Sequence, residues 1–158
     1  MTLFTKTAIT AVLSAGIIAT AAFAESHSDK ALEDAVKARH AQMQMISYHM
    51  GILGGIAKGE TPYDSAMVDA AAQNMAALAG MAPASMWLEG SEQGFTEGSR
   101  AKTEIWSDAA GFEAQFEKLG AGALAMVGAA DAAAVGAGMG AMGAACKACH
   151  EAYRGPKN

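Results

Sequence analysis

Two cysteines and a histidine near the C-terminus are the residues best suited to chemistry in this sequence. Cys146 and Cys149 are the only cysteines among the 158 residues, and His150 follows directly. On a helix the two thiols lie one turn apart on one face, with His150 four residues after Cys146 on the same side. Two thiols so placed can form thioether bonds to the vinyl groups of a haem, whose iron the histidine then ligates. The pattern predicts one covalently attached haem c, with His150 as an axial ligand of the iron.

Other uses of such a cysteine pair fit the sequence less well. A structural zinc site needs four ligands, and no second cysteine pair supplies the missing ones. A thioredoxin-like dithiol lies between a strand and a helix, and no segment shows the strict alternation of a strand. A disulfide that closes so short a loop would stabilise the fold very little. Haem attachment is therefore the favoured interpretation.

The sixth coordination position of the iron must be filled from upstream, or it stays open. Only eight residues follow His150, and none of them is Met, Cys or His. An upstream apolar seam contains Arg39, where a guanidinium needs an anionic partner such as a haem propionate. Met43, one turn further on, would face the iron. The alternative for Arg39 is a snorkelling surface arginine, and the alternative for Met43 is a methionine that only fills the core. His40 flanks this face and is placed to meet a propionate, whereas His49 points about 120° away from Met43 and is a poor ligand candidate.

Hydrophobic periodicity places these residues on helices. Apolar residues recur at steps of three and four along four segments, 29–57, 64–81, 108–130 and 131–153. Asp64 and Asp108 are the expected N-caps of the second and third helices, and a Gly-rich connection spans 82–104. The pattern predicts an all-α fold, an antiparallel four-helix bundle with covalently bound haem c near the C-terminus. Expected seam residues include Met67 in the second helix and Met126 and Ala130 in the third.

The last of these helices is rich in glycine. It contains Gly136, Gly138, Gly140 and Gly143. In a helix interior each costs about 1 kcal/mol relative to alanine. A helix with this composition needs either the close approach of a neighbouring element, as in small-residue packing, or room for a bulky group.

The N-terminal segment predicts export. Lys6 is followed by an uncharged stretch that ends Ala22-Phe23-Ala24, a pattern that signal peptidase accepts. The alternative is an uncleaved membrane anchor, for which this stretch is marginal. We expect residues 1–24 to be a cleaved signal peptide and 25–158 to be one periplasmic domain. Because Lys6 leaves with the signal, the formal charge of −5 becomes −6, which argues against nucleic-acid binding and fits an acidic protein without stable membrane insertion.

Across the mature chain the sequence resembles the cytochrome c′ family, the class II c-type cytochromes. The resemblance rests on "EDAVKARHAQM" (33–43), "KGETPYD" (58–64), "EIWSDAAGF" (104–112) and "CKACHEAYR" (146–154). It implies a four-helix bundle, commonly a homodimer, in which Cys146 and Cys149 carry the thioethers and His150 is the axial ligand. It further implies that the propionates lie by Arg39, His40, Ser99 and Arg100. Met43 would occupy the distal pocket, and Arg154 would lie beside the proximal histidine.

Two functions are compatible with these residues. In the first, five-coordinate iron in an apolar distal pocket binds NO and CO and disfavours O₂, whose bound form needs a hydrogen-bond donor. The protein would then bind or buffer NO and exchange electrons with redox partner proteins, of which basic ones suit its charge. In the second, Met43 is the sixth ligand of a low-spin electron carrier. We do not expect an enzyme, because the sequence offers no nucleophile–base pair and no second metal cluster.

Overall fold

The computed structural model describes residues 27–157, so the predicted signal peptide lies outside the described part of the chain. Within this range the chain is helical and contains no β-strand. Two short elements, the 3-10 helix η1 (Pro83–Ser85) and the single-turn helix α3 (Glu104–Ser107), lie in the connection between the second and third long helices. The long helices are α1 (Asp29–Ala57), α2 (Ser65–Ala79), α4 (Ala109–Leu124) and α5 (Ala132–Tyr153).

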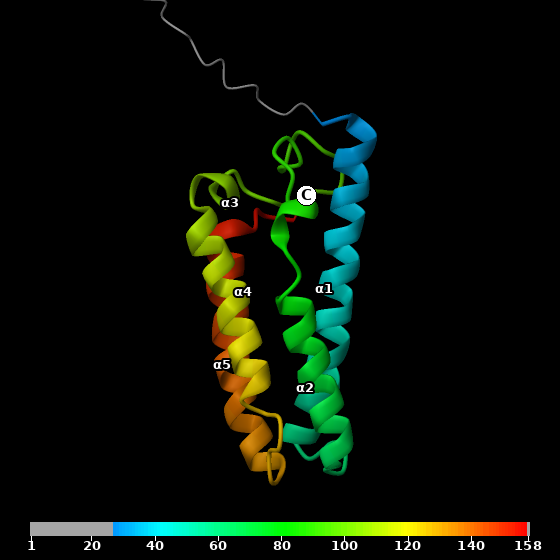
Figure 1. The fold of residues 1–158 in the computed structure, drawn as a ribbon, viewed down its shortest axis with the longest axis vertical. Coiled ribbons are helices and arrows are strands. Elements are labelled where there is room, and N and C mark those ends of the chain that lie inside the picture. The colour runs from blue at the N-terminus through cyan, green and yellow to red at the C-terminus, as the bar shows by residue number, and fades with distance from the viewer. Residues whose placement is uncertain (1–26, 158) are drawn as a thin grey trace, which may run out of the picture.

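The four long helices form an up-and-down bundle. Successive long helices run in opposite directions (Figure 1). α1 packs against α2 and α5, and α4 packs against the same two helices, so the four helices occupy the corners of a square. The predicted all-α four-helix bundle is confirmed.

Each long helix begins at a side chain that accepts a hydrogen bond from the first turn. Asp64 Oδ1 accepts from the N–H of Met67 at 3.0 Å, and Asp108 Oδ1 accepts from the N–H of Gly111 at 3.2 Å. Both predicted caps are therefore confirmed. Asp131 caps α5 in the same way. Such caps contribute about 1 kcal/mol each and fix where the helices start.

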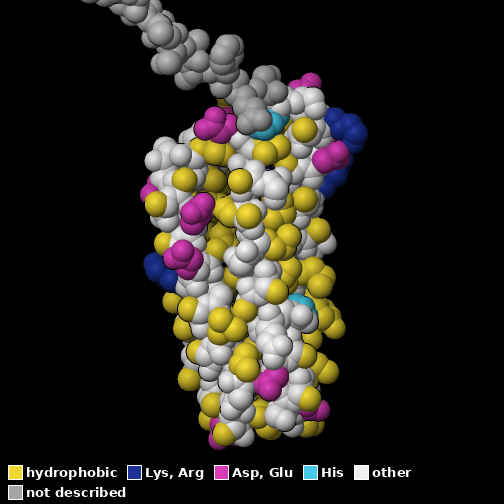
Figure 2. Space-filling model, viewed as in Figure 1, with side chains coloured by type: hydrophobic (Ala, Val, Ile, Leu, Met, Phe, Trp, Pro, Cys, Tyr) yellow, Lys and Arg dark blue, Asp and Glu magenta, His cyan; other side chains and the backbone are white. Residues whose placement is uncertain are grey.

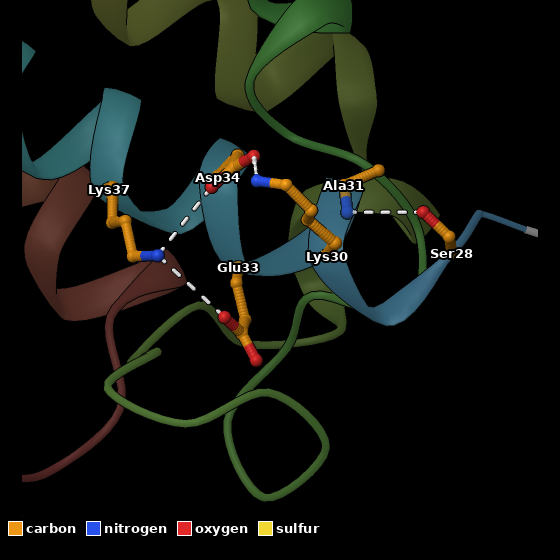
Figure 3. Close-up of polar contacts among 6 residues, drawn as sticks. All are labelled: Ser28, Lys30, Ala31, Glu33, Asp34 and Lys37. Carbon is orange, nitrogen blue, oxygen red and sulfur yellow. Dashed lines mark hydrogen bonds and ion pairs between the residues drawn. The ribbon is translucent and has the colours of Figure 1, made fainter.

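The first turns of α1 combine a cap with exposed ion pairs (Figure 3). Ser28 Oγ accepts from the N–H of Ala31 at 3.3 Å. Lys30 Nζ lies 2.6 Å from a carboxylate oxygen of Asp34, and Lys37 pairs with the carboxylates that precede it by one turn. Because these side chains are exposed, solvent screens the pairs and they add little to stability. They mark the solvent face of α1 and leave the opposite face for packing.

The ends of α2 and α4 differ from the predicted ones. α2 ends at Ala79 with Gly80 as its C-cap, two residues early, and Met67 is 48% exposed because Val68 takes the buried position. α4 ends at Leu124 instead of residue 130, so Ala130 is exposed in the connection between α4 and α5.

A tight turn explains the early end of α4. Gly128 adopts a φ of +75°, which a side chain would strain, and its N–H donates to Asp69 Oδ1 at 2.7 Å. This bond ties the turn to α2. Met126 is fully buried, as predicted, but it reaches the core from the turn.

The lengths of the helices divide the bundle into two halves. α1 has 29 residues and α2 only 15, so α2 covers one half of α1 (Figure 1). In that half a dense core forms around fully buried side chains such as Leu53, Val68 and Met142. In the other half the α2–α4 connection, residues 80–108, takes the place of a helix (Figure 1). A loop fills less space than a helix, and this half holds the candidate site.

The glycines of α5 have different surroundings. A Cβ on Gly138 would lie 2.2 Å from Met126 Cγ, so the predicted close approach is found at this position. Gly136, Gly140 and Gly143 have no neighbouring atom within 4 Å of an added Cβ, so packing does not require glycine there.

By length and composition alone α5 could also cross a membrane. The core helix of a soluble protein passes the same test, and α5 here packs against α1 and α4.

Candidate haem site

A cavity of about 500 Å³, the main cavity, lies in the half of the bundle that α2 does not reach. Volumes of about 300–1,000 Å³ are typical of cofactor sites. Its walls come from α1, the α2–α4 connection, α4 and α5 with the residue that follows it, and no residue of α2 lines it. The lining residues are, in that order, Arg39, His40, Met43, Ile46, Ser47 and Met50; Trp87, Arg100, Ala101 and Ile105; Phe112, Gln115, Phe116 and Leu119; and Ala145, Cys146, Cys149, His150, Tyr153 and Arg154.

The predicted attachment motif lies on α5 and faces this cavity. Cys146, Cys149 and His150 all line it, and all three are half-buried. Helical spacing puts both thiols on one side of α5 with the imidazole next to them. The structure therefore brings the three predicted residues together at one cavity wall.

The two thiols are poorly suited to redox or zinc chemistry on their own. Burial raises the pKa of both, and the pKa of Cys149 to about 11. Reactive dithiols have lowered pKa values, because the thiolate is the nucleophile and the metal ligand. Within residues 27–157 no group of three or more His, Cys, Asp or Glu side chains is placed to hold a metal ion. The raised pKa values therefore argue against a redox dithiol and against metal binding through these two thiols.

His150 has surroundings that favour a neutral imidazole. Burial lowers its pKa first, and the positive charges of Arg154 and Arg100 lower it further. A neutral imidazole has a free nitrogen lone pair, which a metal ligand needs.

The α1 wall contains the residues predicted to lie on the distal side. Met43 lines the cavity and is half-buried, and His40 lines it at an exposed position. Ile46 and Met50 continue the wall as apolar side chains. His49 is buried elsewhere and does not line the cavity, in agreement with its predicted orientation.

Arg39 is buried and bound to the α2–α4 connection. Only 3% of its surface is exposed, so it is not a snorkelling surface residue. Its guanidinium donates to Ser91 Oγ at 2.7 Å, to Ser91 O at 2.6 Å and to Ser99 Oγ at 2.6 Å, with a longer bond of 3.4 Å to Met86 O. Burial lowers its pKa to about 10, while the charge of Glu92 acts in the opposite direction. The sequence predicted an anionic partner for this guanidinium, and the acceptors within the described residues are neutral oxygens of the connection.

Ser99 supports Arg39 and does not line the cavity. Its hydroxyl accepts from Arg39, donates to Ser91 O at 2.6 Å and accepts from the N–H of Ala101 at 3.2 Å. At 1% exposure it lies behind the guanidinium. The structure therefore brings Arg39 and Arg100 to the cavity but not Ser99.

A short backbone pairing holds the cationic mouth of the cavity together. Ala101 and Arg154 form an isolated antiparallel bridge, and the N–H of Gly155 donates to Arg100 O at 2.7 Å. The Arg100 guanidinium in turn donates to Gly155 O at 2.7 Å and to Pro156 O at 3.1 Å. We call this pairing of residues 100–102 with 153–155 the terminal clamp. It places Arg100 and Arg154 at the same cavity.

Trp87 is a site residue that the sequence analysis missed. The Arg39 Cζ lies over its ring, 4.8 Å from the ring centroid, and the ring packs edge-on against Phe112. Its Nε1–H is buried and has no hydrogen-bond partner among the described residues, which leaves a donor free at the cavity. Trp87 lies in a connection without periodicity, so no sequence pattern assigned it to the site.

The charges around the cavity fit an anionic cofactor. Three arginines and two histidines line it, and none of the described Asp or Glu side chains does. Two haem propionates would find cationic groups at the mouth and, in Trp87, an unpaired donor. The donor set, the apolar walls and the charge therefore fit a haem attached through the α5 motif.

Comparisons with known proteins identify the family that the chain resembles. A family model described as cytochrome c′ matches residues 34–154. The chain is 37% identical over 125 residues to cytochrome c-554 of Cereibacter sphaeroides, covering 78% of this chain and 94% of that protein. It is also 37% identical over 128 residues to a cytochrome c′ of Alcaligenes xylosoxydans, covering 79% and 96%.

Solved structures share the fold. A cytochrome c′ of Rhodobacter sphaeroides has a TM-score of 0.74 at 31% identity, covering 80% of this chain and 98% of that one. A nitric oxide complex of an Alcaligenes xylosoxidans cytochrome c′ variant has a TM-score of 0.68 at 35% identity, covering 80% and 97%. A carbon monoxide-bound variant of the same protein has a TM-score of 0.67 at 34% identity, covering 79% and 97%.

These relatives belong to a family whose members carry covalently bound haem c. The family model covers α1 from residue 34 onward and the whole of α2, α4 and α5, including the α5 motif. The chain belongs to the cytochrome c′ family.

Proposed function

We propose that the chain is a periplasmic haem protein that binds NO and CO and exchanges single electrons with redox partner proteins. In this proposal Cys146 and Cys149 would hold a haem through thioether bonds, and His150 would ligate its iron. The single observation that carries it is the position of all three residues on one wall of the main cavity. When bound, the haem supplies an iron that can bind diatomic gases and change its oxidation state by one electron.

The cationic residues have the task of orienting the propionates. Arg39, His40, Arg100 and Arg154 line the cavity, and no Asp or Glu side chain of residues 27–157 lines it with them. Arg39 is held in place by its hydrogen bonds to the α2–α4 connection, so it needs little reorganisation to receive an anion. Ser99 acts indirectly, by fixing the position of this guanidinium.

Gas binding follows from the α1 wall. Met43, Ile46 and Met50 offer no hydrogen-bond donor to a bound gas, and Ser47 is the one hydroxyl among the lining residues of α1. Bound O₂ needs such a donor, whereas NO and CO do not. Relatives of known structure include a nitric oxide complex and a carbon monoxide-bound protein, which supports the same ligands here.

A second candidate function is electron transfer by six-coordinate, low-spin iron. Met43 lines the same cavity as His150 from the facing helix, and a methionine thioether is a good ligand for haem iron. We favour the open site, because class II bundles that this chain resembles usually leave that position empty.

Visible absorption spectra of the ferric and ferrous protein, with and without CO, separate the two functions. An open site predicts high-spin spectra, ready binding of CO and NO, and little change in the resting spectrum in Met43→Leu. A ligated site predicts low-spin bands, sluggish CO binding and conversion to high spin in the same variant. The second set of results would refute the open site and leave haem attachment unaffected.

Covalent attachment has its own test. In the variant with both Cys146→Ala and Cys149→Ala, acid–acetone extraction should remove all haem, whereas the wild-type chain should keep it. Haem that resists extraction from the double variant would contradict the proposed thioethers.

Location and assembly complete the proposal. Export to the periplasm rests on the predicted signal at residues 1–24. A homodimer that packs through α1 is supported by the exposed apolar side chains of Met45 and Tyr48, which are 48% and 63% exposed. The acidic mature chain has no role with nucleic acid and, because α5 is engaged in the bundle, no membrane insertion. N-terminal sequencing of the exported protein and its sedimentation equilibrium test these points. An uncleaved N-terminus or a monomer at all concentrations would contradict them.

A further inference from the structure

A second cavity of about 510 Å³ lies next to the main one and has a different chemical character. It opens between η1, the α2–α4 connection and the first turns of α4. Trp87 and Trp106 give it an aromatic wall, and Glu89 and Glu113 are its acidic residues. No lysine or arginine lines it, and His27, which precedes α1, is its one histidine.

The two carboxylates are free to meet a cation. Glu89 and Glu113 have no ion pair or hydrogen bond with any residue in the described range. On the face shown in Figure 2, hydrophobic side chains are exposed beside Asp and Glu side chains over the upper part of α4, where few Lys or Arg side chains appear. Indole rings attract a cation to their faces, and adjacent carboxylates add to that attraction.

The second cavity also shares a wall with the main cavity, where we propose that the haem lies. Trp87 lines both cavities, as do Ile105 and Phe112. These three side chains, two of them aromatic, therefore form the wall that the two cavities share. The two openings differ in charge, because arginines line the main cavity and carboxylates the second.

We propose that the second cavity docks a lysine or arginine side chain of a basic redox partner. The inference rests on the proposed electron-transfer function and adds the place and chemistry of the encounter. Charge favours this opening, since the carboxylates of the second cavity attract a basic surface. One electron then passes between the partner and this protein across Trp87, and no bond forms or breaks.

Binding is tested with the haem-loaded protein and a redox-inactive probe, a zinc-substituted basic cytochrome c. The reporter is the NMR signal of the Trp106 Nε1–H, which donates to Trp87 O at 2.8 Å inside this region. We expect this signal to shift on titration at low ionic strength. Glu89→Gln with Glu113→Gln should weaken binding roughly tenfold, and added salt should weaken it further.

Glu117→Gln is the matched control. Glu117 lies one turn after Glu113 on α4, is exposed and does not line the cavity. Replacing it should change binding much less than replacing either cavity carboxylate. An equal effect of Glu117→Gln, or no shift of the Trp106 signal, would refute the docking site in favour of a general charge effect.

Stopped-flow kinetics with small reagents add a second readout. The double variant should slow reduction of a cationic oxidant, hexaammineruthenium(III), several-fold and leave the rate with anionic ferricyanide unchanged. A parallel loss with both reagents would overturn the proposal. Haem content and absorption spectra of the variants identify a failure of the haem function itself, which would alter every variant and the wild type alike.

Discussion

Arg39→Lys is the substitution that most directly tests how the α2–α4 connection is held. The variant keeps the positive charge but replaces a planar fork by one nitrogen. In the wild type the fork reaches two serines, with three bonds of 2.6–2.7 Å. A single Nζ cannot reproduce bonds that two guanidinium nitrogens make in different directions.

The expected loss of stability follows from these bonds. Each hydrogen bond from a charged donor contributes about 1.5 kcal/mol or more to the net free energy of folding. The serine oxygens keep other partners within the connection, so the cost is that of the lost bonds and not of stranded buried groups. We expect Arg39→Lys to lower the free energy of unfolding by about 3–5 kcal/mol, a large part of the roughly 5–15 kcal/mol of a typical domain.

Urea denaturation of the haem-loaded protein, followed by far-UV circular dichroism, measures this difference. Lys37→Arg is the control, because Lys37 is exposed on the same helix and should change stability by less than about 0.5 kcal/mol. The slope of the free energy against urea should stay the same in both variants. A loss below about 1 kcal/mol in Arg39→Lys would refute the view that this guanidinium holds the connection.

Two further predictions concern α5. Gly138→Ala should destabilise the fold, because its Cβ would lie 2.2 Å from Met126 Cγ, whereas Gly140→Ala, whose Cβ has no atom within 4 Å, should raise stability by up to about 1 kcal/mol. Thermal unfolding of the two variants measures both changes. Stability changes of the same sign would contradict the packing. Tyr153 donates to Asp108 Oδ2 at 2.6 Å, and this bond raises its pKa to about 12. Because the pKa of Tyr153 is raised in the folded state, its stabilisation is complete below pH 10 and is lost as the pH rises towards 12. Tyr153→Phe should therefore flatten the alkaline part of a plot of unfolding free energy against pH. An unchanged plot would show that the bond contributes nothing.

The sequence predicted the parts of the molecule that follow a period. The bounds of α1 and α5 agree with the predicted ones to within a residue, because both helices have strong apolar stripes and side-chain caps. α4 was predicted six residues too long, since alanine-rich sequence favours helix until the Gly128 turn and its bond to Asp69, a residue far away in sequence.

The site was predictable where a motif carries the chemistry. The positions of Cys146, Cys149 and His150 at one cavity agree with the spacing that predicted them. The acceptors of Arg39 and the place of Trp87 were not predictable, because they depend on how an aperiodic connection folds back over α1. The anomaly of a charge in an apolar seam was visible, but its partners were not.

The terminal clamp has a consequence for the order of folding. It joins residues 100–102 to residues 153–155, so α4 and α5 both lie within the loop that it closes. Closing a longer loop costs more chain entropy, and contacts distant in sequence form later than those within a helical hairpin. The α4–α5 hairpin should therefore assemble first and the clamp last. The mouth of the main cavity would stay open until that final step, which gives a large planar cofactor time to enter before Arg100 and Arg154 come together.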